Sequence, residues 1–243
     1  MASTTAVGGT PTMATPVDLK GDGSIELFCP LNNGSAVCIL TNQGNGTFGV
    51  SGSLAVGDSP HTAAFADING DGKLDVAVAN YAGGSISIFI NDGSGNFVSS
   101  STISPGGSPT SAIFADVNGD GKPDLVWADY GTGDGSTLSV YTNDGSGGFV
   151  FSSSPSVGSG PDCVMAVDVN GDKKLDLVCA NVWSSTLSVL TNDGSGQFVL
   201  AQTLSVGTRP YWFTAADVNG DGAVDLISAN WVDNTITVLT NNG

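Results

Sequence analysis

The chain has 243 residues, with 22 aspartates, one glutamate and only six lysines and arginines together, so its formal net charge is −17. Hydrophobic residues make up 40% of the chain, which is enough apolar surface to offset chain entropy and exclude a disordered acidic tail. The scarcity of Lys and Arg argues against nucleic acid as a partner, because phosphate binding needs a basic face. No apolar run reaches 18 residues, so no membrane insertion is expected.

A nine-residue motif recurs along the chain and divides it into five repeats. The segment Asp67-Ile-Asn-Gly-Asp-Gly-Lys-Leu-Asp75 returns at 116–124, 168–176 and 217–225, and a degraded copy occupies 18–26. The start-to-start spacings are 49, 49, 52 and 49 residues. A unit of this length is one supersecondary element of an array, so residues 1–243 are expected to form a single domain.

Each repeat is expected to contain four antiparallel strands. In the second repeat they are predicted at 63–68, 74–79, 86–90 and 97–103, with a hairpin turn at Asn91-Asp-Gly-Ser-Gly95 because Asn and Gly tolerate positive φ. No segment has a sustained period of 3.6 residues, so helices are expected to be nearly absent. Four strands per unit of this size predict an all-β, five-bladed β-propeller.

The two ends of the chain predict how a ring would close. The fifth repeat stops at Asn241-Asn-Gly243, where a fourth strand would begin. Val7-Gly8 and Pro11 precede the first aspartate loop at the same distances as the Val-Gly pairs and prolines of later repeats. We therefore expect about Ser3 to Val7 to form the outer strand of the last blade, which removes open sheet edges. The alternative is a five-repeat fragment of a longer propeller.

The aspartate loops have the donor pattern of a calcium site. Oxygen donors alternate at Asp67, Asn69, Asp71, the backbone carbonyl of Lys73, and Asp75. Calcium takes six to eight oxygen ligands, whereas magnesium tends to keep several waters. Metal-free Asx-turns would explain one such loop, but not four copies with three carboxylates each. The corresponding donors of the other loops are Asp116, Asn118, Asp120, Lys122 and Asp124; Asp168, Asn170, Asp172, Lys174 and Asp176; and Asp217, Asn219, Asp221, Ala223 and Asp225, with Lys and Ala acting through their carbonyls.

Two of the five loops depart from the pattern. Lys173 stands where the other loops have glycine, and a lysine at positive φ predicts a weaker site. In the first loop Lys20 replaces the asparagine donor, and its ammonium is expected to lie among Asp18, Asp22 and Glu26 in place of a cation. We therefore predict about four calcium sites and one lysine-stabilised mimic.

The repeated DxNGDGxxD motif between two strands resembles the FG-GAP or VCBS repeats of bacterial propellers and integrin α-subunit heads, and extends to bacterial or fungal propeller lectins. The resemblance covers nearly the whole chain. It implies that the calcium loops join the first and second strands on one face and are mainly structural. It also implies that ligands bind the opposite face, on loops between strands two and three and between blades.

The turns after each second strand supply candidate ligand-binding residues, because they combine Asn or Asp with an aromatic ring. Aromatic rings cover the apolar face of a pyranose, while amides and carboxylates bind its hydroxyls. Packing between blades is the alternative role, and it is expected for Trp127 and Tyr141 at strand positions. The candidates are Asn80, Tyr81, Asp129, Tyr130, Asn181, Trp183, Asn230 and Trp231, together with His61 and Trp212 from loops between repeats.

These features predict a calcium-stabilised, non-catalytic binding module, with a multivalent carbohydrate-binding lectin as the first choice. The alternative is an integrin-like or surface-adhesion module that binds protein partners. An enzyme is disfavoured because His61 is the only histidine, although Asp129, Asp134 and Asp233 offer a possible glycosidase pair.

The chain is expected to be secreted or located at the cell surface. Its first residues lack the basic and apolar regions of a signal peptide, which is consistent with prior removal, and the loops suit extracellular calcium concentrations. Cys29 and Cys38 are expected to face each other across adjacent strands, and Cys163 and Cys179 to bracket the fourth loop; disulfides and free thiols both remain open.

Overall fold

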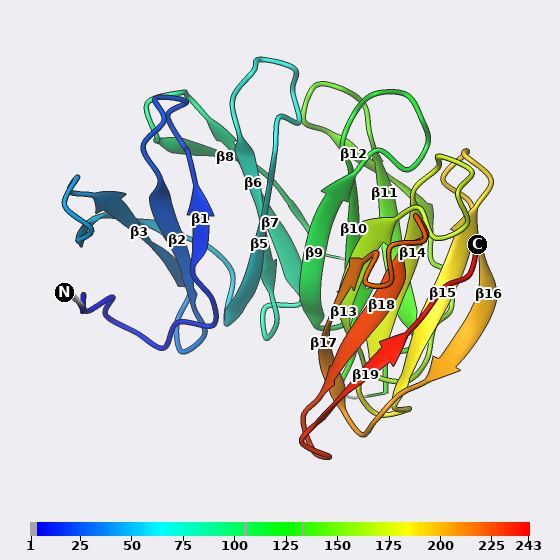
Figure 1. The fold of residues 1–243 in the computed structure, drawn as a ribbon. Helices are drawn as coiled ribbons and strands as arrows, with labels where there is room; N and C mark the ends of the chain where they lie inside the picture. The colour runs from blue at the N-terminus through cyan, green and yellow to red at the C-terminus, as the bar shows by residue number, and fades with distance from the viewer. Residues whose placement is uncertain (1–3, 105, 133) are drawn as a thin grey trace. The chain divides into compact units, whose positions relative to one another are not determined.

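The computed structural model describes residues 4–104, 106–132 and 134–243, which form 19 strands in five antiparallel sheets (Figure 1). The chain divides into two compact units, Met1–Ala112 with Gly145–Gly148, and Ile113–Asp144 with Phe149–Gly243, and the division falls within β9. The described residues contain no helix, and hence none that is long and apolar enough to cross a membrane.

The first unit contains two four-stranded sheets, each with its strands in chain order. The first sheet consists of β1 (Thr15–Val17), β2 (Glu26–Leu31), β3 (Ala36–Asn42) and β4 (Phe48–Ala55). The second sheet consists of β5 (Pro60–Ala66), β6 (Asp75–Asn80), β7 (Ser85–Asn91) and β8 (Phe97–Ile103). The four strands predicted for this repeat are confirmed, except that β5 begins at Pro60 and ends before the aspartate loop.

The second unit contains the other sheets, apart from residues 109–112 of β9, again with their strands in chain order. The third sheet consists of β9 (Pro109–Ala115), β10 (Asp124–Asp129), β11 (Thr137–Asn143) and β12 (Phe149–Ser153). The fourth consists of β13 (Pro161–Val167), β14 (Asp176–Asn181), β15 (Thr186–Asn192) and β16 (Phe198–Ser205), and the fifth of β17 (Pro210–Ala216), β18 (Asp225–Asn230) and β19 (Thr235–Leu239). The all-β prediction and the repeated antiparallel sheets, which are typical of propeller blades, are therefore confirmed for the described residues.

The fifth sheet has three strands among the described residues, with β19 paired only to β18. Of the segment predicted to complete it, Ser3 lies outside the described residues. Thr5 Oγ1 donates to the carbonyl of Phe48 at 2.7 Å, and Val7 packs against Cys29 and its neighbours in the first sheet. The structure shows no fourth strand from this segment, and ring closure stays a prediction.

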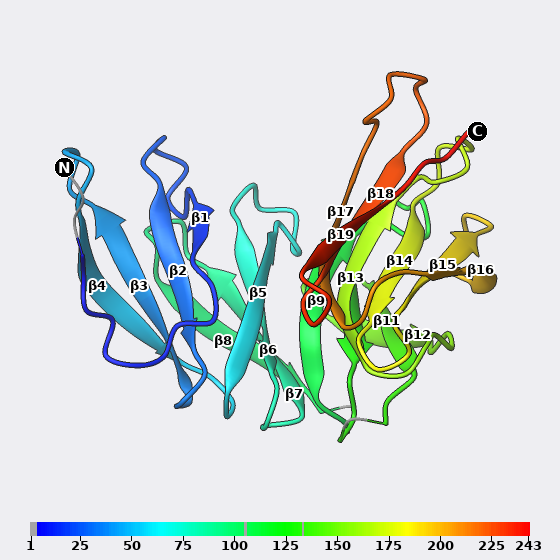
Figure 2. The ribbon, with the colours of Figure 1, turned by 60° about the horizontal axis from the view of Figure 1, so that its bottom comes forward.

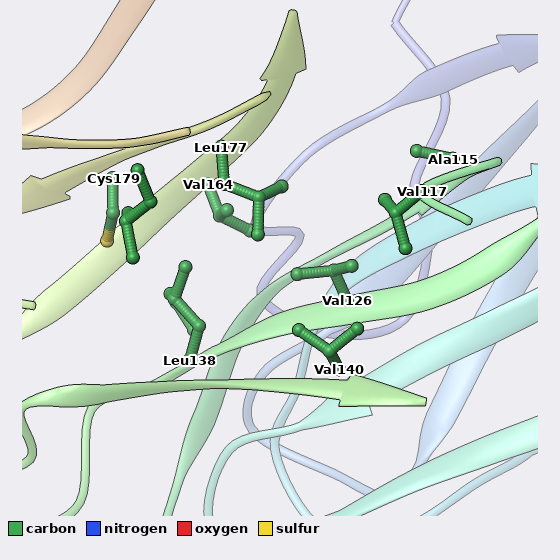
Figure 3. Close-up of a cluster of buried hydrophobic side chains, with 10 residues drawn as sticks. Ala115, Val117, Val126, Leu138, Val140, Val164, Leu177 and Cys179 are labelled. Atoms are coloured by element: carbon green, nitrogen blue, oxygen red, sulfur yellow. The ribbon is translucent and has the colours of Figure 1, made fainter. Parts of the chain in front are cut away.

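Apolar cores lie between adjacent sheets within each unit. In the second unit, Val126 and Leu138 of the third sheet pack with Val164 and Leu177 of the fourth (Figure 3). In the first unit, the ring of Phe28 contacts that of Phe65 edge-on at 5.1 Å. Strands β6 and β14 are buried at every residue, which explains why their sequences are nearly continuous apolar runs rather than alternating ones.

A buried asparagine at the end of the third strand joins neighbouring repeats, and we call this contact the asparagine bridge. Asn192 Nδ2 donates to the carbonyl of Val117 in the preceding repeat at 2.6 Å and to that of Leu175 in its own repeat at 3.0 Å. Its Oδ1 accepts a hydrogen bond from the backbone amide of Gly194 in the hairpin turn that follows the strand. Equivalent bonds join Asn91 to Leu19 at 2.7 Å and Asn241 to Val169 at 2.8 Å.

Replacing Asn192 with alanine is expected to lower the free energy of unfolding by about 2 to 4 kcal/mol, because it leaves two carbonyls without donors in a buried site. Urea denaturation measures the change. The control is Asn96→Ala, which removes the hydrogen bond from Asn96 Nδ2 to Asp92 on an exposed turn. That control is expected to cost roughly 0.5 kcal/mol or less. Equal losses in the two variants would contradict the bridging role.

Candidate functional site

The aspartate loops and the candidate ligand turns lie at opposite ends of each sheet. An antiparallel strand that begins at a loop ends at the following turn, so β6, β10, β14 and β18 each separate one loop from one turn. Figure 2 shows this for the fifth sheet, where the β17–β18 loop projects beyond one end of the strands and the β18–β19 turn lies at the other.

The last aspartate of each motif is buried and accepts backbone hydrogen bonds. Asp176 Oδ2 accepts the amide of Val169 at 3.2 Å, and Oδ1 accepts the amide of Asn192 at 2.8 Å. Burial raises the pKa of the Asp176 carboxyl above its usual range, and the neighbouring carboxylates of Asp172 and Asp168 act in the same direction. The pKa values of Asp75 and Asp124 are raised for the same reasons.

The other donors of the loops are exposed or half-buried and accept hydrogen bonds from the loops' own amides. Asp116 accepts the amides of Gly119 at 2.7 Å and Gly121 at 2.8 Å, and Asn118 Oδ1 accepts the amide of Asp120 at 2.9 Å. Across the described ranges, no three acidic, histidine or cysteine side chains converge closely enough to hold a metal ion. The donors are nevertheless all oxygens, and three carboxylates lie near one another, so the set fits a hard divalent cation if the loop contracts.

A lysine ties three of the loops to the adjacent hairpin turn. Lys73 Nζ donates to the carbonyl of Asp92 at 2.9 Å and lies 3.6 Å from Asp71 Oδ2. Lys122 and Lys174 make the same two contacts in their own repeats. The sequence predicts that Lys73, Lys122 and Lys174 bind calcium through their backbone carbonyls. The contacts of their side chains do not test this prediction.

The two exceptional loops differ from the others in the expected places. Lys173 has φ 68°, as predicted for a residue at a glycine position. Lys20 Nζ lies 3.2 Å from Oε1 of the buried Glu26, whose Oε2 accepts the amide of Leu19. Within the described chain, Lys20 forms no ion pair with Asp18 or Asp22, because their carboxylates accept amides of their own loop. In the first loop, the Lys20 ammonium therefore pairs with the Glu26 carboxylate alone, and not with the three carboxylates predicted for the lysine-stabilised mimic.

The asparagines predicted on the ligand face are buried in the sheets. Asn80, Asn181 and Asn230 are at most 2% exposed. Asn80 Nδ2 donates to Ser85 Oγ at 3.2 Å and to Ser87 Oγ at 2.9 Å, which fastens the turn to the third strand. A Cβ atom at Gly57 would lie 2.8 Å from Asn80 Cγ, so the glycine of the Val-Gly pair is required by this contact. These side chains therefore hold the turns rather than face solvent.

Asp129 takes the place of this asparagine in the third repeat. Its Oδ1 accepts the indole N–H of Trp127 at 2.7 Å, and its Oδ2 accepts the hydroxyl of Ser139 at 2.6 Å. Burial raises the pKa of Asp129. Trp127 is fully buried and stacks on Tyr141 at 4.8 Å, as predicted for its strand position. Both carboxylate oxygens of Asp129 therefore accept hydrogen bonds from side chains of its own sheet.

Exposed aromatic side chains gather on the fifth sheet. Trp212 lies in β17, and His61 in β5, rather than in the loops between repeats where they were predicted. Trp212 is 55% and Trp231 65% exposed, and Trp231 meets the ring of Tyr211 edge-on at 5.4 Å. They surround a hollow of about 720 Å³. Its lining also includes Asn234, which the sequence patterns did not single out, and Ile236, which holds the same strand position as the buried Ile86 and Leu187 of other repeats.

The remaining predicted aromatics form two further groups. In the second unit, Trp183 is 44% exposed and lies 6.3 Å from Tyr130, ring centroid to ring centroid. In the first unit, the half-buried rings of His61 and Tyr81 lie 6.1 Å apart, and His61 Nδ1 is 3.1 Å from the carbonyl of Thr110. The structure therefore places these candidates in pairs: Tyr130 and Trp183 come from neighbouring repeats, whereas His61 with Tyr81 and Tyr211 with Trp231 each belong to one repeat.

Both pairs of cysteines lie in the predicted strands: Cys29 and Cys38 in β2 and β3, and Cys163 and Cys179 in β13 and β14, which bracket the fourth loop. Cys29 and Cys38 are directly opposite each other in the β2–β3 register. Cys163 instead pairs with Ala180, and Cys179 with Val164, so the second pair is offset by one residue. All four cysteines are buried.

Repeated antiparallel sheets, each with an aspartate loop between its first and second strands, define a repeat protein of propeller type. The sequence model of the FG-GAP-like repeat matches residues 18–78, 67–127, 116–179 and 168–228. The chain therefore belongs to the FG-GAP-like repeat family. A search of curated proteins gave no match.

Solved structures share the fold at low sequence identity. The periplasmic gluconolactonase PpgL of Pseudomonas aeruginosa is similar with a TM-score of 0.63 and 18% identity, over 93% of this chain and 56% of its own. BBS1N in complex with ARL6DN gives 0.61 and 13%, over 96% of this chain and 69% of its own. A functionally unknown protein from Desulfotomaculum acetoxidans gives 0.60 and 12%, over 93% and 69%. At these identities the similarity shows the fold alone.

Replacing Asp129 with asparagine is expected to flatten the dependence of stability on acidic pH. Because the folded-state pKa of Asp129 is raised above 3.8, the wild type loses stability as pH rises from about 3.8 through the raised pKa. The amide of the variant carries no charge, and it can accept from Trp127 and donate to Ser139. Denaturant unfolding across this pH range measures the difference. Asp134→Asn, on an exposed turn, is the control, and coincident profiles for wild type and Asp129→Asn would refute the assignment.

Proposed function

We propose that the protein is a calcium-stabilised, non-catalytic module that binds carbohydrate at the turn end of its sheets. The observation that carries the proposal is the hollow lined by Tyr211, Trp212 and Trp231, two of which expose more than half of their surface. Large aromatic rings usually lose most of this exposure unless they serve an interface. Their flat apolar faces suit the C–H face of a pyranose, and the Asn234 amide offers donors and an acceptor for hydroxyls.

The number of equivalent sites in this proposal is smaller than the number of repeats. The hollow belongs to the fifth sheet, and Trp183 with Tyr130 provides a second aromatic surface at the turns of the preceding two repeats. Asn181 and Asn230, which end β14 and β18, are buried, so the exposed asparagine at the hollow is Asn234. Multivalency is therefore proposed to arise from two unlike aromatic surfaces in this unit, rather than from five copies of one site.

The proposal assigns calcium to the four loops that carry three aspartates. Asp67, Asp71 and Asp75 represent one such loop, and the Asp75 carboxyl is buried close to the other two. A divalent cation would balance this charge and hold the loop between its two strands. In the first loop Lys20 already supplies a positive charge to Glu26, so no calcium is proposed there.

Calorimetric titration of protein freed of metal by a chelator is expected to give four calcium sites, and added calcium to raise the midpoint of thermal unfolding. At a calcium concentration about 100 times Kd, each site would add about 2.7 kcal/mol to the free energy of unfolding. Asp120→Ala is expected to remove one site, while Asp134→Ala, outside the loops, leaves four. The double substitution Lys20→Asn with Glu26→Asp is expected to create a fifth. No calcium binding, or an unchanged number of sites in Asp120→Ala, would refute the metal assignment.

A glycan array probed with and without calcium tests carbohydrate binding. The wild type is expected to bind a subset of glycans, and Trp231→Ala to weaken that binding by about 2 kcal/mol, or roughly 30-fold. Phe151→Ala, an exposed aromatic of the outer strand β12, is the matched control and is expected to bind like the wild type.

Three outcomes would count against the proposal. If the wild type binds no glycan, a surface-adhesion module that contacts proteins becomes the better assignment. If Trp231→Ala binds as well as the wild type, the hollow is not the site. If the protein hydrolyses gluconolactone, the reaction suggested by the name of PpgL, it is not a non-catalytic module.

A further inference from the structure

Arg209 is the only arginine of the chain, and it lies among the aromatic residues of the turns. Its guanidinium carbon is 4.5 Å from the centroid of the Trp183 ring. Among the residues that the structure places, Arg209 forms no ion pair; every ion pair seen there involves a lysine. In a chain with 22 aspartates, this side chain keeps an uncompensated positive charge beside an exposed indole.

The backbone at Arg209 would favour glycine. Arg209 precedes Pro210 and has φ 59°. The residues that precede the corresponding prolines in two other repeats, Ser59 and Gly160, also have positive φ, at 51° and 69°. A residue with a Cβ atom is strained there. The positive φ is thus shared by several repeats, and in the fifth repeat the side chain that it carries is the guanidinium of Arg209.

Trp183 is a fixed platform for that guanidinium. A Cβ atom at Gly160 would lie 2.2 Å from Trp183 Cδ1, so the indole rests directly on the backbone of Gly160. Tyr130 packs near the same indole, at 6.3 Å between ring centroids. The cation and two aromatic rings are therefore held together before any ligand arrives, which lowers the ordering cost of binding.

We infer that this cluster selects a glycan that contains uronic acid residues, with Arg209 binding the sugar carboxylate and the aromatic rings covering the sugar. A guanidinium forms two parallel hydrogen bonds to a carboxylate, and such charge-assisted pairs are stronger than neutral ones. The five lysines all belong to aspartate loops at the other end of their sheets, so Arg209 is the cation that an acidic sugar meets at the turns. The inference rests on the proposed carbohydrate binding and specifies its substrate class.

Calorimetry with a trisaccharide of galacturonic acid and the matching neutral trisaccharide of galactose tests the inference. In calcium and low salt, the wild type is expected to bind the acidic sugar at least roughly tenfold more tightly than the neutral one. Arg209→Gln is expected to bind the acidic sugar roughly tenfold to a hundredfold more weakly and the neutral sugar unchanged. Arg209→Lys keeps the charge without the planar fork and is expected to fall between them, which also covers a failure of Arg209→Gln to fold.

Ser100→Asp is the matched control, because it makes the same change in net charge at an exposed position of β8. It is expected to bind the acidic sugar like the wild type, and a loss equal to that of Arg209→Gln would show only a general charge effect and overturn the inference. Equal binding of the acidic sugar by wild type and Arg209→Gln, or preference of the wild type for the neutral sugar, would also overturn it. Absence of binding to any glycan would instead refute the proposed function itself.

Discussion

A buried aspartate that accepts the backbone amide of a buried asparagine links the loop of a repeat to its third strand and to the neighbouring repeat. In the fourth repeat, Asp176 closes its loop through the amide of Val169 and accepts the amide of Asn192 at the end of the third strand. The side chain of Asn192 then reaches Val117 in the preceding repeat. Loop, strand and neighbouring repeat thus share one network of satisfied polar groups. Because buried polar atoms are costly without partners, this network fixes the register in which repeats stack more strictly than apolar contact alone.

The strands and loops could be predicted from the sequence because their signals are local. The Asp67–Asp75 motif and the Asn91–Gly95 turn each act over a few residues, and both lie where expected. The asparagine bridge was missed because Asn91 reads as an ordinary turn residue, while its partner Leu19 is 72 positions away. Its recurrence 16 residues after the closing aspartate was the available signal. Hydrogen bonds between repeats leave no trace in any single repeat.

The exposure of the candidate ligand residues was predicted in part. The position of Asn80 beside Tyr81 predicts a ligand contact, yet Asn80 is the last residue of a strand that is buried throughout. Strand position alone does not divide the rings: Trp127 within β10 is buried and Trp231, one residue past β18, is exposed, yet Trp212 within β17 is 55% exposed. Exposure depends on what packs against the strand, which the sequence of one repeat does not show. Arg209 carried no sequence signal, because a single arginine belongs to no pattern.

The ion pair between Lys20 and Glu26 has a consequence for how the chain folds as it is synthesised. A bound ion can be withdrawn by a chelator or be missing where the chain is synthesised, whereas a lysine is part of the chain itself. The repeat that carries this lysine is also the first of the five to leave the ribosome. Its loop can close as soon as β1 and β2 meet, because the positive charge beside Glu26 belongs to the same stretch of chain.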